Sequence, residues 1–345
     1  MAELMLRSFA SDNNSGAAPE IIEAIAEANM GHAVGYGDDP WTSRAEERFA
    51  AVFGPQAHTY FVLNGTGSNV LALSLVASHG QAVLCAEGAH IAVDETGAPE
   101  AAVGCKVIQL ESSAGKIQAH SLRESLSVLG SVHQAQPSCL SLSQPTELGT
   151  LYSPEEMREL ISIAHDAGLR VHMDGARIAN AAAGLGLGLA DVSSRLGVDV
   201  LSFGGMKNGV AFGEALVVLD PGLAQRAPFL RKTHLQLDSK MRFISAQYDA
   251  YLSKGVWLRN ATAANAAAQR LKQRLSSIPD VELVYPVQSN ALFARIPRAA
   301  AERLRSRYFF YDWEGGLVRW MTSFDTTAED VERFADALGS ALQGG

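Results

Sequence analysis

Lys207 is the residue of this chain whose setting most suggests chemistry. It lies in Gly204–Gly209 (GGMKNG), a neutral, glycine-rich turn between two apolar runs. Glycines let a backbone approach a ligand closely, and a lysine that is desolvated among them has a lowered pKa. A neutral amine of this kind can form an imine with an aldehyde. The alternative is a surface hairpin that carries an incidental lysine.

A carboxylate and a guanidinium follow another apolar run. Leu169–Met173 is typical of a strand, and Asp174 and Arg177 come directly after it. Ligands of open α/β sheets bind at the carboxyl edge of the strands, where these two side chains would lie. A carboxylate that accompanies an imine-forming lysine can pair with a protonated pyridine nitrogen and keep that ring an electron sink. Without Lys207, the Asp-Gly pair would indicate only a turn.

A second glycine-rich segment, Asn64–Asn69 (NGTGSN), follows the apolar run Thr59–Leu63 and opens a helix-periodic stretch. Backbone amides at a helix start, with the hydroxyls of Thr66 and Ser68, form an anion site that suits a phosphate ester. The segment has neither the spacing of a dinucleotide fingerprint nor the Gly-Lys-Ser/Thr ending of a P-loop. A phosphorylated cofactor or a mononucleotide therefore fits it better.

Two more residues gain a role once a cofactor ring is assumed. His90 comes just past the run Ala82–Cys85 and could stack on a pyridine ring, although a histidine at a helix start is often satisfied by local backbone. Glu147 follows the run Ser138–Leu142 and would project to the same sheet edge. On its own it is an ordinary loop acid.

The elements that must position these residues alternate along the chain. Helix-periodic segments at Ser68–Ser78, Ser121–Leu129 and Ser153–Ala167 separate many of the apolar runs, and the last of them opens with Ser-Pro-Glu-Glu, a helix-start signature. This alternation predicts an α/β fold with a mostly parallel sheet covered by helices. The predicted buried strands are Thr59–Leu63, Ala82–Cys85, Lys106–Leu110, Ser138–Leu142, Leu169–Met173, Val198–Phe203 and Glu214–Leu219.

After about residue 245 the pattern changes. A long Ala-rich helix is followed by short strands and helices, which is the α+β signature of a smaller C-terminal domain. We therefore expect an N-terminal arm over 1–20, a large domain over 21–245 and a small domain over 246–345, with no linker between the last two. The elements expected in the small domain are a helix over Trp257–Ile278, strands at Val281–Tyr285 and Ala291–Ile296, a helix near Ala299–Ser306, a strand near Leu317–Met321 and a final helix.

Composition narrows the class of partner. The 345 residues carry a net charge of -9 and no cluster of Lys or Arg, which argues against a nucleic-acid or anionic-membrane surface. A small molecule is the expected partner. Three cysteines within apolar runs, Cys85, Cys105 and Cys139, suit reduced, buried thiols and a cytoplasmic protein. We expect no signal peptide, no membrane span and no metal site.

Taken together, these motifs resemble the low-specificity L-threonine aldolases. That group belongs to the aspartate-aminotransferase-like, fold type I enzymes that depend on pyridoxal 5'-phosphate (PLP), and is related to the β-eliminating lyases. The resemblance covers essentially the whole chain. It is carried by Ser11-Asp12-Asn13, Tyr36-Gly37-Asp38-Asp39, Asn64-Gly65-Thr66, Ala89-His90, His172 to Arg177, Phe203 to Gly209 and Ser239-Lys240-Met241-Arg242.

The resemblance implies a role for each matched residue. Lys207 would hold PLP as a Schiff base, Asp174 would pair with the pyridine nitrogen and His90 would stack on the ring. Gly65 and Thr66 would bind the cofactor phosphate, and Arg242 would contact a phosphate across a subunit interface. Arg177 would contact the cofactor or the substrate carboxylate, and Arg319 would bind that carboxylate. Ser11 and Tyr36 would make further substrate contacts. Such enzymes are homodimers or homotetramers with shared sites, which would also explain an unstructured N-terminal arm.

One departure affects the catalytic base. Many members carry Thr-His-Asn-Gly where this chain has Thr146-Glu147-Leu148-Gly149, so a second histidine is missing. The base is then expected to be His90, or a water held between His90 and Glu147. The expected reaction is cleavage of a β-hydroxy-α-amino acid such as threonine, allo-threonine or phenylserine to glycine and an aldehyde, by an aldehyde-lyase. Two alternatives stay open: β-elimination or transamination, and a non-catalytic phosphate-binding protein.

Overall fold

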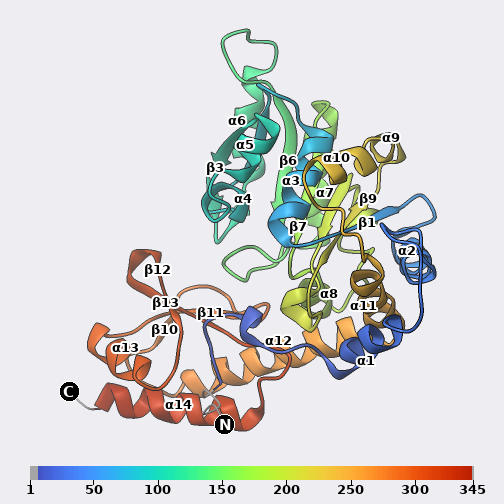
Figure 1. Cartoon of the computed structure of the whole chain (residues 1–345). Coiled ribbons are helices and arrows are strands. Elements are labelled where there is room, and N and C mark those ends of the chain that lie inside the picture. Colours follow the sequence, from blue (N-terminus) through green and yellow to red (C-terminus); the bar gives the residue numbers. More distant parts are fainter. Residues whose placement is uncertain (1–6, 344–345) are drawn as a thin grey trace.

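A seven-stranded sheet forms the centre of the large domain (Figure 1). The computed structural model describes residues 7–343, so the first six residues of the predicted arm and the last two of the chain lie outside it. The strand order is β1-β9-β8-β7-β6-β2-β3. The strands are β1 (His58–Val62), β2 (Ala82–Ala86), β3 (Lys106–Leu110), β6 (Pro137–Ser143), β7 (Arg170–Gly175), β8 (Val200–Phe203) and β9 (Glu214–Val218).

The sheet is mostly parallel, as the sequence predicts. The pairs β8 with β7, β7 with β6, β6 with β2 and β2 with β3 are parallel, whereas β9 runs antiparallel to both β8 and β1. The two antiparallel steps cancel, so β1 points the same way as β8. The carboxyl ends of all strands except β9 therefore lie along one edge of the sheet.

One strand differs from its prediction. Lys106–Leu110 was expected to be a buried strand, but only Leu110 is buried in β3. The reason is its position, because β3 is an edge strand with a neighbour on one side only.

Helices cover both faces of the sheet, and successive side chains of a strand point alternately to one face and to the other. In β9, Ala215 and Val217 pack into the core beneath helices α1, α2 and α11, whereas Leu216 and Val218 pack on the other face beneath α3 and α10. The helices of this domain are α1 (Pro19–Ala28), α2 (Pro40–Phe53), α3 (Gly65–Val76), α4 (His90–Val93), α5 (Ala98–Val103), α6 (Ala119–Ser125), α7 (Pro154–Asp166), α8 (Ile178–Leu185), α9 (Pro221–Ala224), α10 (Ala227–Thr233) and α11 (Arg242–Ser253).

The start of α7 confirms the helix signature read from the sequence. The Ser153 hydroxyl accepts a bond from the Glu156 amide at 3.2 Å, and the Glu156 carboxylate accepts one from the Ser153 amide at 2.7 Å. Pro154 occupies the first helical position, where no amide donor is needed.

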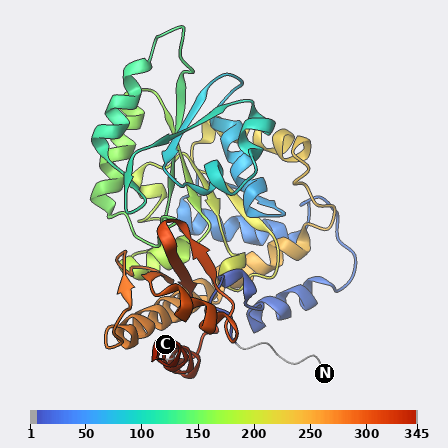
Figure 2. The ribbon, with the colours of Figure 1, turned by 90° about the vertical axis from the view of Figure 1, so that its left-hand side faces the viewer.

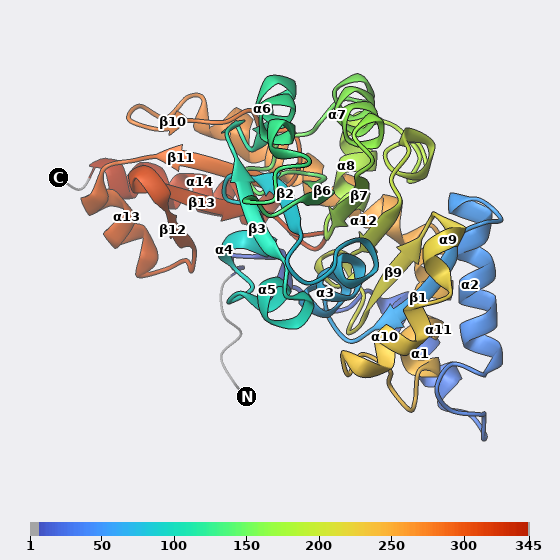
Figure 3. The ribbon, with the colours of Figure 1, turned by 90° about the horizontal axis from the view of Figure 1, so that it is seen from above.

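The small domain holds a separate core. A four-stranded antiparallel sheet in the order β10-β11-β13-β12 packs on α12, α13 and α14. Figure 3 shows the small sheet, α13 and α14 at one end of the molecule, helices α1, α2 and α11 at the other, and α12 between them. The elements are α12 (Val256–Leu275), β10 (Glu282–Leu283), β11 (Ala291–Arg295), α13 (Arg298–Arg305), β12 (Tyr311–Trp313), β13 (Leu317–Met321) and α14 (Ala328–Gln343).

Short elements complete the described chain. They are a hairpin of β4 (Ser112–Ser113) and β5 (Lys116–Ile117), and the 3-10 turns η1 (Asp12–Asn14), η2 (Leu126–Val128), η3 (Ser194–Leu196), η4 (Met206–Asn208) and η5 (Glu314–Gly316). Among residues 7–343, none of the helices combines the length and apolarity that crossing a bilayer demands.

The described part of the N-terminal arm is structured, contrary to the expectation of an unstructured segment. Phe9 is fully buried in the small-domain core, where its ring packs on Tyr308 and Phe334. Its carbonyl accepts the Met321 amide at 2.8 Å, and its amide donates to the Phe309 carbonyl at 3.1 Å. The arm therefore extends the small sheet before it turns toward the large domain (Figure 2).

Candidate functional site

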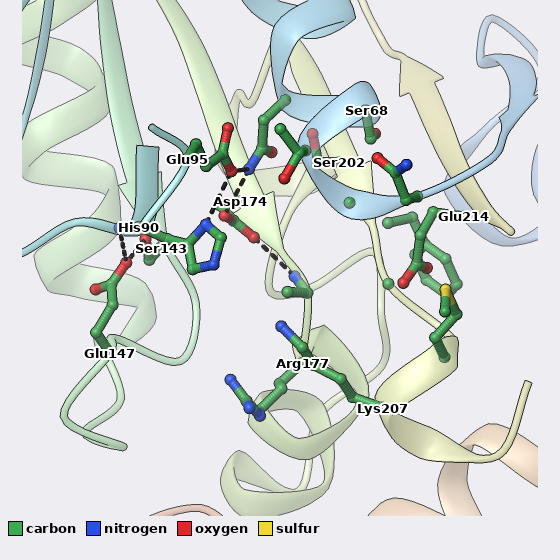
Figure 4. A pocket seen from close by; sticks show the side chains of 18 of the residues that line it. Ser68, His90, Glu95, Ser143, Glu147, Asp174, Arg177, Ser202, Lys207 and Glu214 are labelled. Carbon is green, nitrogen blue, oxygen red and sulfur yellow. Dashed lines mark hydrogen bonds and ion pairs between the residues drawn. The ribbon is translucent and has the colours of Figure 1, made fainter. Parts of the chain in front are cut away.

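A cavity of about 240 Å³ lies at the carboxyl edge of the large sheet (Figure 4). Its walls come from the segments that follow β1, β2, β6, β7 and β8, which is where ligands bind in open α/β sheets. Among the residues predicted from the sequence, the cavity brings together Gly65, Thr66, His90, Glu147, Asp174, Arg177 and Lys207. The predicted residues Ser11, Tyr36, Arg242 and Arg319 do not line it.

Lys207 lies in the turn after β8, within η4, and its side chain enters the cavity. The turn is closely packed: a side chain at Gly205 would meet the Tyr248 hydroxyl, and one at Gly204 would meet the Ala176 backbone. Burial and the nearby Arg177 charge lower the pKa of Lys207 from its ordinary value. The amine is thereby made more nucleophilic near neutral pH, as the sequence predicts.

Asp174 is buried near the end of β7, across the cavity from Lys207. Its Oδ1 accepts the Ala176 amide at 2.9 Å and its Oδ2 accepts the Asn69 side-chain amide at 3.0 Å. Burial alone would raise the pKa of Asp174, but the charges of Lys207 and His90 outweigh it, and the pKa lies below its usual range. A fixed negative charge therefore faces the cavity.

The His90 side chain is oriented by a second buried carboxylate. Its Nδ1 lies 2.8 Å from Glu95 Oε1, and the Asn69 side-chain amide donates to the same oxygen at 2.8 Å. Because Asn69 also donates to Asp174, one amide nitrogen links the two carboxylates. The hydrogen bond from Glu95 raises the pKa of His90, against the opposing effect of burial.

Sequence reasoning missed both Glu95 and Asn69. Glu95 has no periodic pattern around it, and Asn69 looks like one more polar residue of the glycine-rich segment. The only available signal was that Glu95 follows His90 closely in the chain.

Glu147 reaches the cavity from the loop after β6. Its Oε1 accepts the His90 backbone amide at 2.9 Å and the Ser143 hydroxyl at 2.7 Å. Burial raises the pKa of Glu147, and these two donors oppose the shift. The carboxyl group is thus anchored through one oxygen, and no hydrogen bond to Oε2 occurs among the described residues.

The start of α3 has the form of an anion site. Asn64 caps the helix by accepting the Gly67 amide at 2.7 Å, whereas the amides of Gly65 and Thr66 have no hydrogen-bond partner within residues 7–343. Ser68 also lines the cavity, and its hydroxyl lies 3.5 Å from the Ala215 carbonyl, so its part in anion binding stays a prediction.

Arg177 forms a buried ion pair with a residue of the N-terminal arm. Its Nε and Nη2 donate to the two oxygens of Asp12 at 2.6 and 2.8 Å. Arg319, from β13, lies between the rings of Tyr311 and Trp313, 5.3 and 4.9 Å from their centroids. Its Nη2 donates to the Ala10 carbonyl at 3.1 Å.

The other predicted residues lie in two further places. Ser11 caps η1 by accepting the Asn13 amide at 3.2 Å, and Asn13 lines the cavity in its stead. Tyr36 and Arg242 lie outside the cavity on two segments that bond to each other: the Tyr36 amide donates to the Ser239 carbonyl, and Arg242 donates to the Gly31 carbonyl.

Glu214 also lines the cavity, although sequence reasoning did not select it. It stands at the amino end of β9, which lies at the same sheet edge as the carboxyl ends of the other strands because β9 runs antiparallel to its neighbours. Its Oε2 accepts the Gly205 amide at 2.6 Å and the Tyr248 hydroxyl at 2.9 Å. Burial raises the pKa of Glu214 to about 7. The side chain thereby braces the turn that carries Lys207.

A lysine on the turn after one strand, an ionised carboxylate at the end of its neighbour and a helix start with unpaired amides, all on a mostly parallel sheet, define a PLP enzyme of fold type I. The residues fit this cofactor: the lysine suits its aldehyde, the carboxylate its pyridine nitrogen and the α3 amides its phosphate. The chain belongs to the beta-eliminating lyase family, whose family model matches residues 8–297.

Two curated relatives match almost the entire chain. The low specificity L-threonine aldolase of Pseudomonas aeruginosa is 41% identical over 332 residues, which is 95% of this chain and 96% of the relative. That of a Pseudomonas species is 41% identical over 339 residues, or 97% and 98% of the two chains. A solved threonine aldolase of Leishmania major superposes with a TM-score of 0.92 at 29% identity, over 97% of this chain and 99% of that one.

Proposed function

We propose that this enzyme cleaves L-threonine, L-allo-threonine and related β-hydroxy-α-amino acids, phenylserine among them, to glycine and an aldehyde. One observation carries the proposal. Lys207, Asp174 and His90 meet at one cavity in a chain that is 41% identical to two threonine aldolases over nearly its full length. The reaction is that of a carbon–carbon lyase of the aldehyde-lyase class.

Lys207 and Asp174 supply the cofactor chemistry. When bound, PLP provides the aldehyde that receives the substrate amine and the ring that accepts the electrons of the broken Cα–Cβ bond. Lys207 would hold the cofactor through its amine, and its lowered pKa favours the neutral form that reacts with an aldehyde. Asp174 keeps the pyridine nitrogen protonated through its fixed negative charge.

The proton of the β-hydroxyl goes to His90 or to a water held between His90 and Glu147. Because Nδ1 of His90 is directed at Glu95, Nε2 is the ring atom left to accept a proton. Glu147 is anchored through Oε1, so Oε2 is the atom that would hold the water. Both residues line the same cavity as Lys207.

The substrate carboxylate binds at the corner formed by Arg177 and Arg319, with Ser11 beside it. Both arginines contact residues of the same short segment, Ala10–Asp12. A guanidinium offers donors in a planar fork that matches a carboxylate. The amides of Gly65 and Thr66 take the cofactor phosphate.

A product assay separates this function from β-elimination and transamination. The holoenzyme is incubated with threonine, allo-threonine and phenylserine, and glycine, aldehyde, ammonia and keto acid are measured. Equal amounts of glycine and aldehyde support the proposal. Ammonia or keto acid as the main product would reject it. A protein that shows no PLP absorbance, and none sensitive to borohydride, would instead be a phosphate-binding protein.

Glu147→Gln tests the proton acceptor. The amide oxygen still accepts the His90 and Ser143 donors, so the fold and the cofactor absorbance should stay unchanged. On the water-bridge version, cleavage slows by about 10²-fold, the usual scale for a positioned base. Full activity would assign the proton to His90 alone.

We further propose a homodimer or homotetramer with shared sites, in which Tyr36 and Arg242 serve the partner's cavity. In support, neither residue lines its own cavity, hydrogen bonds join the segments that carry them, and exposed apolar side chains occur nearby in sequence, including Met30, Val34 and Leu235. Arg242 would then bind the cofactor phosphate of the neighbouring subunit.

Hybrid oligomers test the sharing. Lys207→Ala and Arg242→Ala proteins, each inactive alone, are dissociated and mixed. One intact site per hybrid dimer should restore part of the activity if sites are shared. If mixing restores nothing while light scattering shows that hybrids form, each site is complete within one chain.

Two smaller proposals complete the description. A cytoplasmic location is supported by the three cysteines, which are all free and buried. The division into an arm (1–20), a large domain (21–245) and a small domain (246–345) is supported by the separate apolar cores. Limited proteolysis of the apo-protein would test the last boundary.

A further inference from the structure

Asp12 is a fully buried charge next to Arg177 of the cavity wall, and the proposed reaction gives it no role. Its side chain is fully buried, and burial of an unpaired carboxylate is costly. Burial alone would raise the pKa of Asp12, but Arg177, by charge and hydrogen bond, and the charge of Lys207 hold the pKa below its ordinary value. Asp12 is therefore an ionised group with a specific task.

The geometry of the ion pair defines that task. Asp12 receives Nε and Nη2 of Arg177, which fixes the plane of the guanidinium along one edge. Nη1 has no hydrogen-bond partner within the described chain, and Arg177 lines the cavity. Nη2 also donates to Met321 Sδ at 3.1 Å, so Nη1 is the guanidinium nitrogen left for a ligand, already oriented before the ligand arrives.

Asp12 is itself held in place from the small domain. The Asn290 side-chain amide donates to Asp12 Oδ2 at 3.0 Å and to the Thr322 carbonyl at 2.8 Å. Two residues earlier, the Ala10 carbonyl receives Arg319 at 3.1 Å. The segment Phe9–Asp12 therefore sets the position of both arginines at once.

We propose that Asp12 is a positioning residue for the substrate carboxylate: it orients Arg177 and, through the segment Phe9–Asp12, joins Arg177 and Arg319 into one binding unit. The inference rests on the proposed function for the identity of the substrate. It deepens that function because it adds a residue that never touches substrate but sets the affinity for any α-amino acid.

The test is Asp12→Asn. This substitution keeps the shape of the side chain, but its single carbonyl oxygen accepts a hydrogen bond from only one of the two Arg177 donors. Affinity is read from the change in cofactor absorbance on adding glycine or threonine, so it does not depend on cleavage. The dissociation constants should rise about 10-fold, as expected for loss of one charge-assisted bond, with PLP content unchanged. Isopropanolamine, which is threonine without its carboxylate, should bind equally to both proteins.

Arg7→Ala is the matched control. Arg7 precedes this segment, pairs with Asp325 and Asp330 and lies outside the cavity, so its loss removes two ion pairs while the backbone bonds of Phe9 keep the arm docked. It should leave amino-acid binding unchanged. If it weakens binding as much as Asp12→Asn does, docking of the arm is the cause and the proposal is wrong.

Three other outcomes would also overturn the proposal. They are an unchanged amino-acid affinity in Asp12→Asn, tighter binding that shows Asp12 competing with the substrate, or an equal loss of affinity for isopropanolamine. If Asp12→Asn does not fold, Asp12→Glu keeps the charge but displaces the guanidinium, and the same comparison applies. A wild-type enzyme that binds threonine without cleaving it would reject the proposed function and leave the role of Asp12 testable.

Discussion

The two sides of the cavity are built in different ways. The side where we place the cofactor ring comes from the large domain alone: Lys207, Asp174 and His90 lie at or just after the ends of strands of one sheet, and Asn69 and Glu95 link Asp174 to His90. On the side where we place the substrate carboxylate, Arg177 of the large domain lines the cavity, and behind it lie segments from the two ends of the described chain, Ala10–Asp12 and β13.

The difference concerns which steps each side controls. A set of groups fixed within one sheet can bind the cofactor regardless of how the small domain sits. A corner assembled from three segments is complete only when the small domain and the arm are docked. Substitutions on the first side should therefore affect cofactor binding and turnover. Substitutions on the second side should affect substrate affinity.

Lys207→Ala should have the largest effect. It removes the one amine in the cavity, so covalent attachment of PLP is lost and turnover falls to background, while the fold persists. Borohydride reduction followed by mass spectrometry measures the attachment. Lys272→Ala, on the exposed surface of α12, is the control. Cofactor still fixed to the Lys207→Ala chain would contradict the assignment.

Asp174→Asn should retain PLP through its phosphate but lower turnover by about 10²–10³-fold, the scale for loss of one electrostatic stabiliser. The threonine KM should change little. Asp199→Asn offers a comparison, because it neutralises a buried carboxylate at the opposite edge of the sheet. It should lower the melting temperature and spare turnover. Near-normal turnover in Asp174→Asn would remove that residue from its role.

Arg319→Ala should raise the KM for threonine about 10-fold, since it deletes one charge-assisted contact, with little loss of PLP affinity. Arg295→Ala removes an exposed arginine from the adjacent strand and should change neither the KM for threonine nor the affinity for PLP. Equal losses of substrate and cofactor affinity in Arg319→Ala would place this guanidinium at the phosphate and break the comparison between the two sides.

Glu95→Gln should give the smallest change, a lower pKa of His90. The hydrogen bond with Glu95 holds that pKa above its ordinary value, so a neutral amide lets the ring lose its proton at lower pH. Histidine NMR of the apo-protein measures the shift, with the signal assigned by His90→Asn. If His90 is the base, the acid limb of the rate profile moves to lower pH as well. An upward or absent NMR shift would refute the interaction.

The positions that follow strands were predictable from the sequence. All seven strands of the large sheet lie within two residues of their predicted bounds, because the six buried strands leave apolar runs in the sequence and the edge strand β3 is still mostly apolar. Once the strands are known, the convergence of Lys207, Asp174, His90 and Glu147 follows from the common direction of their carboxyl ends.

Contacts between remote segments were not predictable in the same way. Asp12 has no periodic surroundings, and its partner Arg177 lies 165 residues away. Strand β12 was missed because its three residues, Tyr311–Trp313, are too few to show an alternation. Arg242 and Tyr36 were predicted as site residues from the family resemblance alone, and no local sequence pattern indicates where they lie.

The docking of the arm also bears on the order in which the protein is made. Ala10 leaves the ribosome long before Arg319, its partner 309 residues later in the chain. The large sheet can form during synthesis, because its strands are complete by Val218. Phe9 therefore stays uncovered until β13 has been synthesised. The corner where we place the substrate carboxylate forms only after the large sheet is complete.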